Sequence, residues 1–351
     1  MRARRQRAQH HLHQERLTVS DVLLLAAIAA ALVFDFTNGF HDTANAIATS
    51  ISTRALSPRL AVLMAAVLNL VGALVTVVFF GARVSNTIAS LLAQPTVVVI
   101  IAALLGATVW NLITWYAGLP SSSTHALVGG LIGAGVAAAG GFGGVHWRAV
   151  GTVVTWLVLS PPIGFLVAAA IMLVIYAAVH SRRPHPINKA FRHAQILTSA
   201  FVSYSHGSND AQKSMAAMGM ALLATGHFQK FTVPIWVVFL AATAIGFGTY
   251  AGGWRIIRTL GWRIYKLDPA TGFGAQLAGA ATIQVATLFG LPVSTTHVVT
   301  GSVIGAGAPR RLTAAGWGVG ANIVAAWILT IPVAATISWV AFAVMRTARL
   351  G

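Results

Sequence analysis

The sequence predicts an all-α polytopic membrane protein with two inverted-topology repeats, broken helices and re-entrant hairpins. Of its 351 residues, 57% are hydrophobic and 8% are charged, against roughly 25% charged residues in a typical soluble domain. The hydrophobic residues form runs long enough for bilayer-spanning helices, and short basic clusters separate these runs. Motifs of the first half recur in the same order in the second half.

The repeats divide the chain into four parts. These are a basic disordered tail (1–18), a first transmembrane repeat (19–180), a central basic loop (181–193) and a second transmembrane repeat (194–351). In the first repeat we expect hydrophobic helices at residues 19–52, 60–80, 96–118 with 122–139, and 149–179. In the second repeat we expect them at residues 194–224, 231–252, 270–290 with 294–308, and 314–345.

The duplication is clearest in the paired segments. GLPSSSTHALVGGLIGAG (118–135) recurs as GLPVSTTHVVTGSVIGAG (290–307), with 11 of 18 positions identical. FTNGFHDTANA (36–46) matches YSHGSNDAQKS (204–214) more loosely, and all pairs lie 168 to 172 residues apart. Each pair of joined segments is either two spanning helices or one re-entrant hairpin. Both alternatives give an odd number of crossings per repeat, which inverts the second repeat, as in many secondary transporters.

The composition excludes several classes of site. With no cysteine, the chain has no disulfide, thiolate metal site or cysteine nucleophile. The net charge of +17 comes mainly from arginines in loops and tails, where the positive-inside rule places them, so no nucleic-acid partner is expected. For His10, His11 and His13, a disordered basic tail is favoured over metal binding.

Each hairpin segment carries hydroxyl side chains directly after a Gly-Leu-Pro tripeptide. The clusters are Ser122, Ser123 and Thr124 in the first repeat and Ser294, Thr295 and Thr296 in the second. Serine and threonine are preferred helix N-caps, and a first helical turn leaves N–H groups unpaired at the positive end of the dipole. Inside a membrane such helix starts form an anion cradle, whereas at the surface they are only capped helices. The presence of the hydroxyl cluster in both repeats favours the anion-binding interpretation. His125 and His297 follow, as proton carriers or as helix–helix hydrogen-bonding groups.

Asp42 and Asp210 occupy matched positions in the looser repeat. A carboxylate within a membrane helix costs about 2.5–3.5 kcal/mol on insertion scales and therefore marks a candidate functional site. Neighbouring glycine and asparagine suggest locally unwound helix, where oxygen atoms bind a cation or a proton. Asp35 has no acidic counterpart, because Ser203 matches it.

Asn45 follows Asp42 by one turn and is a candidate ligand or helix–helix hydrogen-bonding group. Its counterpart is Lys213, an ammonium in place of an amide. A paired cation site would therefore be asymmetric, with at least one half unable to bind a metal ion as the other could. Cations that travel with an anion also remove the penalty of moving charge against the membrane potential, about 2.3 kcal/mol per charge per 100 mV.

The segments NGFHDTANAIATSI (38–51) and SHGSNDAQKSMA (205–216), with both GLP-Ser/Thr segments, resemble the inorganic phosphate transporter (PiT) family, in its bacterial low-affinity form. The resemblance covers nearly the whole chain. It implies inverted repeats that move phosphate with sodium or protons, or a neutral metal–phosphate complex in some bacterial members. It also implies a cytoplasmic central loop and a signature site of Asp42, Asp210, Asn45 and Asn209, with the hydroxyl clusters at hairpin tips facing the anion.

Two positions depart from this pattern. His41 precedes Asp42 where many members have asparagine, and Gln212-Lys213 stands where sodium-coupled members more often have Ala-Asn. Both departures resemble the bacterial proton-linked subgroup and argue against a mechanism with two sodium ions.

We therefore expect a secondary transporter, not an enzyme, that imports inorganic phosphate or neutral metal–phosphate by alternating access with protons. The alternatives are a sulfate permease of the same fold, a sodium-coupled phosphate symporter and, in a different class, an anion channel. An intramembrane hydrolase is disfavoured by the duplicated serine and histidine. The expected phosphate ligands are Ser122, Ser123, Thr124, Ser294, Thr295, Thr296 and Asn209. The expected coupling-ion or proton groups are Asp42, Asp210, Asn45, Asp35 and His41.

No metal site is assigned, and no cofactor is expected beyond the coupling cation, a proton or else sodium. The expected partners are inorganic phosphate, free or as a divalent-metal complex, the lipid bilayer and a second copy of the chain in a homodimer. The expected location is the bacterial plasma membrane, which the chain crosses several times.

Overall fold

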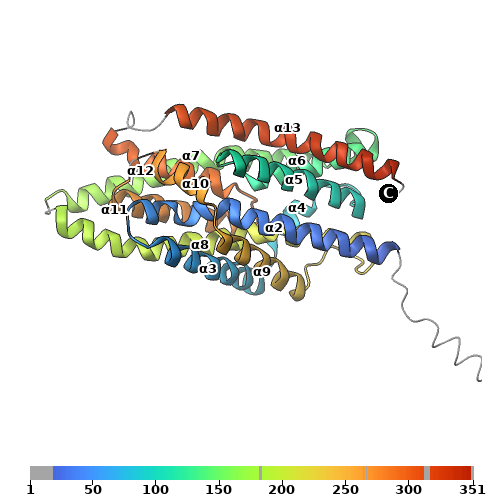
Figure 1. Cartoon of the computed structure of the whole chain (residues 1–351), viewed down its shortest axis with the longest axis horizontal. Helices are drawn as coiled ribbons and strands as arrows, with labels where there is room; N and C mark the ends of the chain where they lie inside the picture. The colour runs from blue at the N-terminus through green and yellow to red at the C-terminus, as the bar shows by residue number, and fades with distance from the viewer. Residues whose placement is uncertain (1–18, 182–183, 264, 266, 312–316, 349–351) are drawn as a thin grey trace, which may run out of the picture.

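The computed structural model describes residues 19–181, 184–263, 265, 267–311 and 317–348. Within these residues the chain is helical and forms no β-strand (Figure 1). The tail (1–18), with His10, His11 and His13, lies outside the described residues.

The helices of the first half are α2 (Val19–Ser52), α3 (Pro58–Phe80), α4 (Arg83–Ala89), α5 (Val97–Ala117), α6 (Ser123–Ala139), η1 (Phe142–Gly144) and α7 (Trp147–Val179). Those of the second half are α8 (Pro184–Ala224), α9 (Ile235–Ala251), α10 (Trp254–Arg258), η2 (Thr259–Arg263), α11 (Pro269–Leu288), α12 (Thr295–Arg311) and α13 (Trp317–Thr347).

Several helices are long and apolar enough to cross a membrane. Five of them meet this description among the described residues, namely α2, α3, α5, α7 and most of α13. A sixth span is added if α9 and the segment Trp254–Trp262, which meet at a bend of 60°, count as one. The expected all-α polytopic membrane protein is confirmed, whereas the inverted relation of the two halves remains a prediction.

The structure differs from the sequence analysis at two places. Residues 184–193, expected in the central loop, form the start of α8, because prolines in a first helical turn remove no intrahelical hydrogen bond. The expected unwinding around Asp42 and Asp210 is absent, since α2 and α8 are continuous helices there. Their polar side chains hydrogen-bond to neighbouring helices, as Thr43 Oγ1 does to the Thr249 carbonyl of α9 at 3.2 Å, so they find partners without a break in the helix.

The two joined pairs, α5–α6 and α11–α12, form hairpins whose tips meet inside the bundle. The first helix of each pair ends at a glycine with positive φ, 67° at Gly118 and 72° at Gly290, a conformation that favours glycine. The tips touch where Thr124 Oγ1 donates to the Val293 carbonyl at 3.1 Å. Figure 1 shows the hairpins extending from this meeting point toward opposite ends of the bundle, as expected for re-entrant segments.

Matched glycines pack the second helix of each hairpin against the other half of the chain. A methyl group at Gly129 or Gly133 of α6 would overlap the backbone of α13. A methyl group at Gly301 or Gly305 of α12 would likewise overlap the backbone of α7. Small residues allow this close approach of membrane helices. Each hairpin is therefore held by the last long helix of the opposite repeat.

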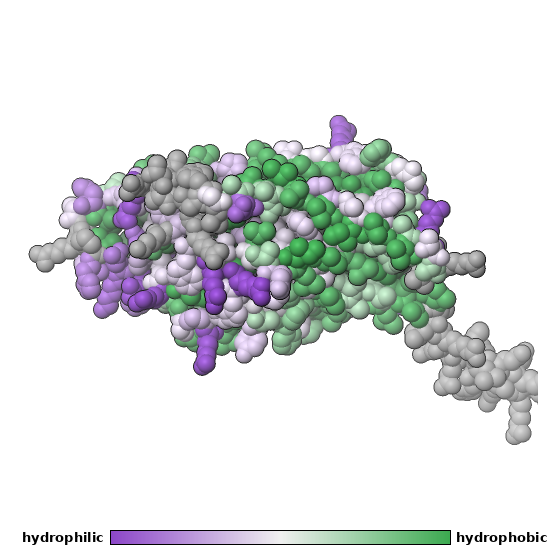
Figure 2. Space-filling model, turned by 45° about the horizontal axis from the view of Figure 1, so that its top comes forward, coloured by the Kyte–Doolittle hydropathy of each residue, from purple (hydrophilic) through white to green (hydrophobic). Residues whose placement is uncertain are grey.

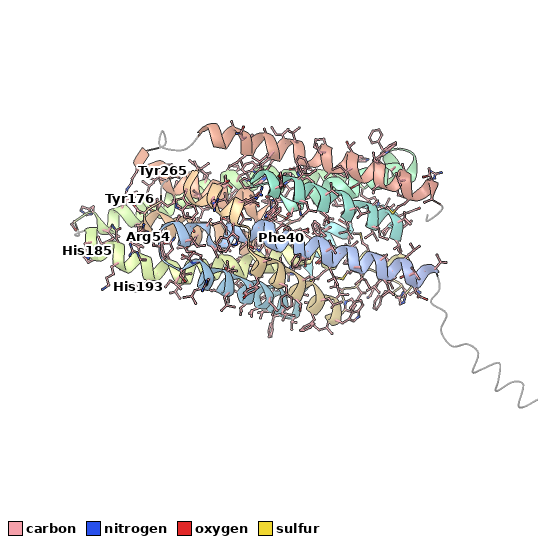
Figure 3. All side chains as sticks on the ribbon, viewed as in Figure 1. Phe40, Arg54, Tyr176, His185, His193 and Tyr265 are labelled. Carbon is pink, nitrogen blue, oxygen red and sulfur yellow. The ribbon has the colours of Figure 1, made fainter. Side chains whose placement is uncertain are left out.

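The polar and apolar surfaces separate along the long axis. Figure 2 shows hydrophilic residues gathered at one end and a broad hydrophobic surface over the middle and the other half. In Figure 3, Arg54, His185 and His193 lie toward the hydrophilic end, whereas Phe40 lies near the middle. Because Asp42 follows Phe40 by two residues on α2, the meeting point of the hairpin tips lies deep within the apolar part of the molecule.

Close packing of α3 against α8 leads to a prediction about stability. A Gly207→Ala substitution would place a methyl group against the Asn69 carbonyl of α3, and overpacking of this kind costs about 1–3 kcal/mol. We expect a lower thermal unfolding midpoint in detergent for Gly207→Ala. Gly151→Ala on α7 is the matched control, because nothing lies within 4 Å of its added methyl. Equal midpoints for the two variants would contradict this packing.

Candidate functional site at the hairpin tips

A cluster of buried polar side chains surrounds the meeting point of the hairpin tips. The central pair is Asp42 of α2 and Asp210 of α8, with 1% and 0% of their surfaces exposed. His206, one turn before Asp210, completes a group whose candidate ligand atoms all lie within 4.8 Å of one another. Burial of so many polar groups is expensive unless they are paired or serve a function.

Asp42 receives hydroxyl groups from both hairpin tips. Ser123 Oγ donates to Asp42 Oδ2 at 3.0 Å, and Thr296 Oγ1 donates to Asp42 Oδ1 at 3.2 Å. His41 Nδ1 lies 2.7 Å from Asp42 Oδ1, and its Nε2 lies 3.1 Å from Thr114 Oγ1 of α5. Asp42 therefore joins α2 to both hairpins.

Asp210 has a different set of partners, which includes an ion pair with a lysine. Lys213 Nζ lies 2.9 Å from Asp210 Oδ2, and Thr295 Oγ1 donates to the same oxygen at 3.4 Å. The Lys213 ammonium also donates to Ser123 Oγ at 2.7 Å. Lys213 thus links α8 to the tip of the first hairpin, and its charge is paired within the protein.

The two halves exchange contacts across the cluster. Asn38 Nδ2 of the first half donates to Asp210 Oδ2 at 3.3 Å. Its counterpart in the second half, His206, approaches both carboxylates, at 4.0 Å from Asp42 Oδ2 and 3.2 Å from Asp210 Oδ2. Sequence reasoning missed Asn38 and His206, although their matched positions, 168 residues apart in the looser repeat, were a signal that could have found them.

The first serine of each hydroxyl cluster caps its helix. Ser122 Oγ accepts the His125 N–H at 3.1 Å, and Ser294 Oγ accepts the His297 N–H at 3.2 Å. In each tip helix the two residues after the cap contribute N–H groups that have no carbonyl acceptor within the helix. The tips thus combine buried hydroxyls with amide donors at the positive ends of two helix dipoles, a combination suited to an anion.

The remaining predicted residues lie around this centre. Asn45 Nδ2 donates to Thr296 Oγ1 at 2.9 Å, so Asn45 lies beside Asp42 as expected. Asn209 Nδ2 donates to Thr287 Oγ1 of α11 at 2.8 Å, and among the described residues it makes no hydrogen bond to the carboxylates. Asp35, two turns before Asp42, accepts a hydrogen bond from Ser214 at 2.8 Å and adjoins the cluster through Asn38, Lys213 and Asp210.

His125 and His297 meet at the contact between the tips. Their ring centroids are 4.5 Å apart, and His297 also stacks on Trp327 of α13 at 3.7 Å. The indole N–H of Trp327 donates to the Pro120 carbonyl of the other tip at 3.1 Å. These contacts make the histidines part of the packing between the hairpins, and they do not touch the carboxylates.

The charges of the cluster are not balanced. The fixed charges are the carboxylates of Asp42 and Asp210 and the ammonium of Lys213, whereas His41 and His206 are charged only when protonated. Asp42 is the carboxylate without a fixed cationic partner. An anion added beside these groups would be repelled unless a cation entered as well. The site therefore has donors for an anion and an acceptor, Asp42, for an accompanying cation.

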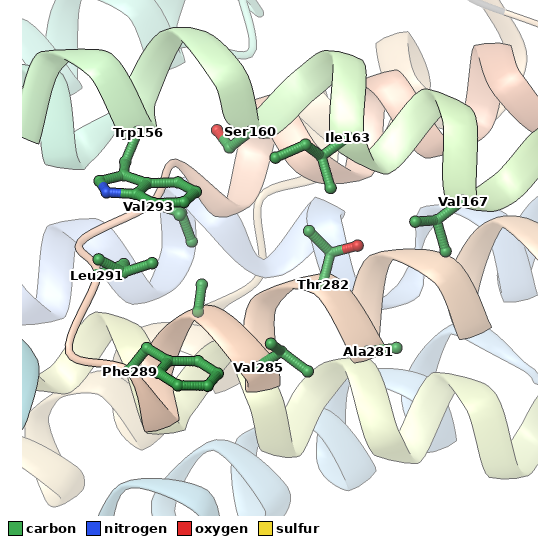
Figure 4. A pocket seen from close by; sticks show the side chains of 11 residues that line it. Trp156, Ser160, Ile163, Val167, Ala281, Thr282, Val285, Phe289, Leu291 and Val293 are labelled. Carbon is green, nitrogen blue, oxygen red and sulfur yellow. The ribbon is translucent and has the colours of Figure 1, made fainter.

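A separate cavity of about 660 Å³ lies between α7 and α11, beside the segment 289–293 that leads to the second tip (Figure 4). Its lining is apolar apart from Trp156, Ser160 and Thr282. Because it offers few donors and no charge, it is not suited to an anion.

Comparison with known proteins adds four findings. The profile of the phosphate transporter family matches residues 38–338. The chain is 45% identical over 325 residues, 92% of this chain and 96% of the relative, to the "Probable low-affinity inorganic phosphate transporter" of Rhizobium meliloti (strain 1021). It is 44% identical over 331 residues, 93% of this chain and 98% of the relative, to a protein of the same name in Bacillus subtilis (strain 168). A solved structure described as "The sodium-dependent phosphate transporter" matches 93% of this chain and 99% of its own, with a TM-score of 0.86 and 28% identity.

Proposed function

This chain belongs to the phosphate transporter family, and from the geometry of its buried cluster we propose that it imports inorganic phosphate together with a cation. The proposed phosphate site lies between the hairpin tips. Its ligands are the tip hydroxyls of Ser123, Thr295 and Thr296 and the free amides at the starts of α6 and α12. Ser122, Ser294 and Thr124 shape the tips, and Asn209 supports the second hairpin from α8.

The observation that carries this proposal is the convergence of two anion-binding helix starts on one pair of carboxylates. Ser123 and Thr296 come from opposite hairpins, yet both donate to Asp42. A bound oxyanion would accept hydrogen bonds from these hydroxyls in place of the carboxylate. Hydrogen bonds to charged groups contribute about 1.5–3 kcal/mol each, which is enough for specific binding when several act together.

The carboxylates also favour phosphate over sulfate. Near neutral pH phosphate keeps at least one proton, which it can donate to Asp42 or Asp210, whereas sulfate keeps none. Sulfate at the same place would bring unprotonated oxygens against the two carboxylates. We therefore place a sulfate permease second.

The presence of two carboxylates and one ammonium as the fixed charges of the cluster supports coupling to a cation. Asp42, with His41 at 2.7 Å and the Asn45 amide nearby, is the proposed coupling group. We propose a proton as the coupling ion, because Asp42 and His41 already share a close hydrogen-bonding contact. Sodium coupling is the alternative, supported by the likeness to a solved transporter that is described as sodium-dependent. Asp35, buried on the same helix, is a second proton-binding candidate.

Alternating access is the proposed mode of transport, in preference to a channel. The tips contact each other through the Thr124–Val293 hydrogen bond and the paired histidines, which favours a gated site over an open channel. We also propose a bacterial plasma-membrane location, a cytoplasmic central loop and a homodimer.

Uptake into proteoliposomes tests the proposal. Labelled phosphate should accumulate when a proton gradient is imposed, and excess unlabelled phosphate should compete while sulfate should not. Accumulation only with a sodium gradient would overturn the proton proposal. Equal competition by sulfate would overturn the proposed substrate, and no phosphate uptake under any gradient would overturn the function.

A further inference from the structure

We propose that Lys213 is a built-in counter-cation that replaces one exchangeable monovalent cation of the coupling machinery. The inference rests on the proposed function as a cation-coupled phosphate transporter. According to this inference, Lys213 determines how many cations accompany each phosphate. Lys213 also excludes sodium from the Asp210 half of the site.

The position of the ammonium supports this role. Lys213 is completely buried, and among the described residues its Nζ contacts one carboxylate and one hydroxyl, at 2.9 Å from Asp210 Oδ2 and 2.7 Å from Ser123 Oγ. A carboxylate and a hydroxyl oxygen are hard oxygen ligands of the kind that bind small cations. The ammonium therefore occupies the place where a free cation would otherwise contact Asp210.

The internal repeat supplies the comparison. Asn45 occupies the matching place in the first half and donates to Thr296 of the opposite hairpin, just as Lys213 donates to Ser123 of the opposite hairpin. The Asn45 side-chain oxygen is buried and has no hydrogen-bond partner among the described residues. The first half thus keeps an open oxygen ligand beside Asp42, whereas the second half fills the equivalent position with a tethered charge.

Lys213 also connects the two halves of the site. Its ammonium donates to Ser123, and Ser123 donates in turn to Asp42. The fixed charge thereby holds the hydroxyl of the first tip in place without a cation that must bind and leave in each cycle. Asp42 then remains as the group that takes up the exchangeable cation.

The test compares sodium dependence in the wild type and in Lys213→Asn, which installs the residue of the first half. In proteoliposomes, wild-type phosphate uptake should be unchanged when choline replaces sodium, and labelled sodium should not enter with phosphate. For Lys213→Asn, sodium should raise phosphate uptake about tenfold or more, a factor that corresponds to a modest binding preference. Sodium should also raise the thermal unfolding midpoint of this variant and not that of the wild type.

Lys213→Arg keeps the charge and should keep sodium-independent uptake, although at a lower rate. Lys230→Asn, an exposed lysine in the loop after α8, is the matched control and should behave as the wild type. The inference is overturned if sodium neither stimulates Lys213→Asn nor raises its midpoint, or if more than one sodium ion enters with each phosphate in the wild type. A single sodium ion per phosphate would instead overturn the proton proposal for Asp42. The wild-type measurement applies even if the asparagine variant does not fold. Failure of the wild type to take up phosphate at all would instead overturn the proposed function.

Discussion

Replacing Asp42 with asparagine is expected to abolish phosphate uptake while leaving the protein folded. The substitution keeps the shape of the side chain but removes a carboxylate charge that has no lysine or arginine partner among the described residues. Two unit charges about 4 Å apart attract each other by about 4 kcal/mol at an effective dielectric constant of 20. Even half of that attraction corresponds to a loss of more than about tenfold in cation binding. We expect uptake at least about 100-fold below the wild type, because both cation binding and its coupling to phosphate are affected.

Asp210→Asn should also abolish uptake, but with a cost in stability that Asp42→Asn does not show. It leaves the buried Lys213 ammonium without its carboxylate, and breaking a buried ion pair in this way costs about 3–5 kcal/mol. Its unfolding midpoint should therefore fall below that of Asp42→Asn. The double variant Asp210→Asn with Lys213→Met removes both charges and should recover part of the midpoint without recovering uptake.

Asp268→Asn is the control for both carboxylates. Asp268 caps α11 and pairs with Arg310 at the exposed end of the second hairpin, away from the cluster. Asparagine is also a good N-cap, so this variant should keep both stability and uptake. Substantial uptake by a folded Asp42→Asn protein would contradict the proposed coupling role.

The second large effect is expected for the tip hydroxyls. Ser123→Ala and Thr295→Val remove donors from opposite hairpins that lie against Asp42 and Asp210. Loss of a hydrogen bond to a charged ligand costs about 1.5–3 kcal/mol, so each change should raise the KM for phosphate by about 10- to 100-fold. The pair together should raise it further.

Ser160→Ala provides the matched control for the hydroxyls. Ser160 is equally buried, but its hydroxyl bonds the Leu157 carbonyl of its own helix and lines the apolar cavity. Its KM should stay near the wild-type value. A KM that is unchanged in Ser123→Ala and Thr295→Val would show that phosphate does not bind at the tips.

The fold was largely predictable because the duplication and the hydropathy both leave strong signals. The predicted limits of the helices fall within a few residues of α2, α3, α5, α6 and α7. The membership of the phosphate transporter family and the transporter class are confirmed by the family match and the named relatives. The continuity of α2 and α8 was not predictable, since glycine and asparagine suggest unwinding unless neighbouring helices supply partners. Those partners, such as Thr249 and Asn69, are distant in sequence.

Most residues of the site were predictable from the sequence, whereas the hydrogen bonds between them were not. Duplication brought out Asp42, Asp210 and the hydroxyl clusters, and the structure places these together. The duplication could not reveal that Ser123 hydrogen-bonds to both Asp42 and Lys213, because this requires a hairpin tip to reach two helices. Nor could it show that Asn209 bonds α11, since that depends on which face of α8 the side chain occupies.

The position of phosphate in the bound protein tests the proposed site most directly. A structure of transport-competent protein determined in saturating phosphate should show the anion between the starts of α6 and α12. It should lie within hydrogen-bonding distance of the Ser123 and Thr295 hydroxyls, with Lys213 still paired to Asp210. Phosphate bound away from both hairpin tips, with the hydroxyls still bonded to the carboxylates, would contradict the proposed site.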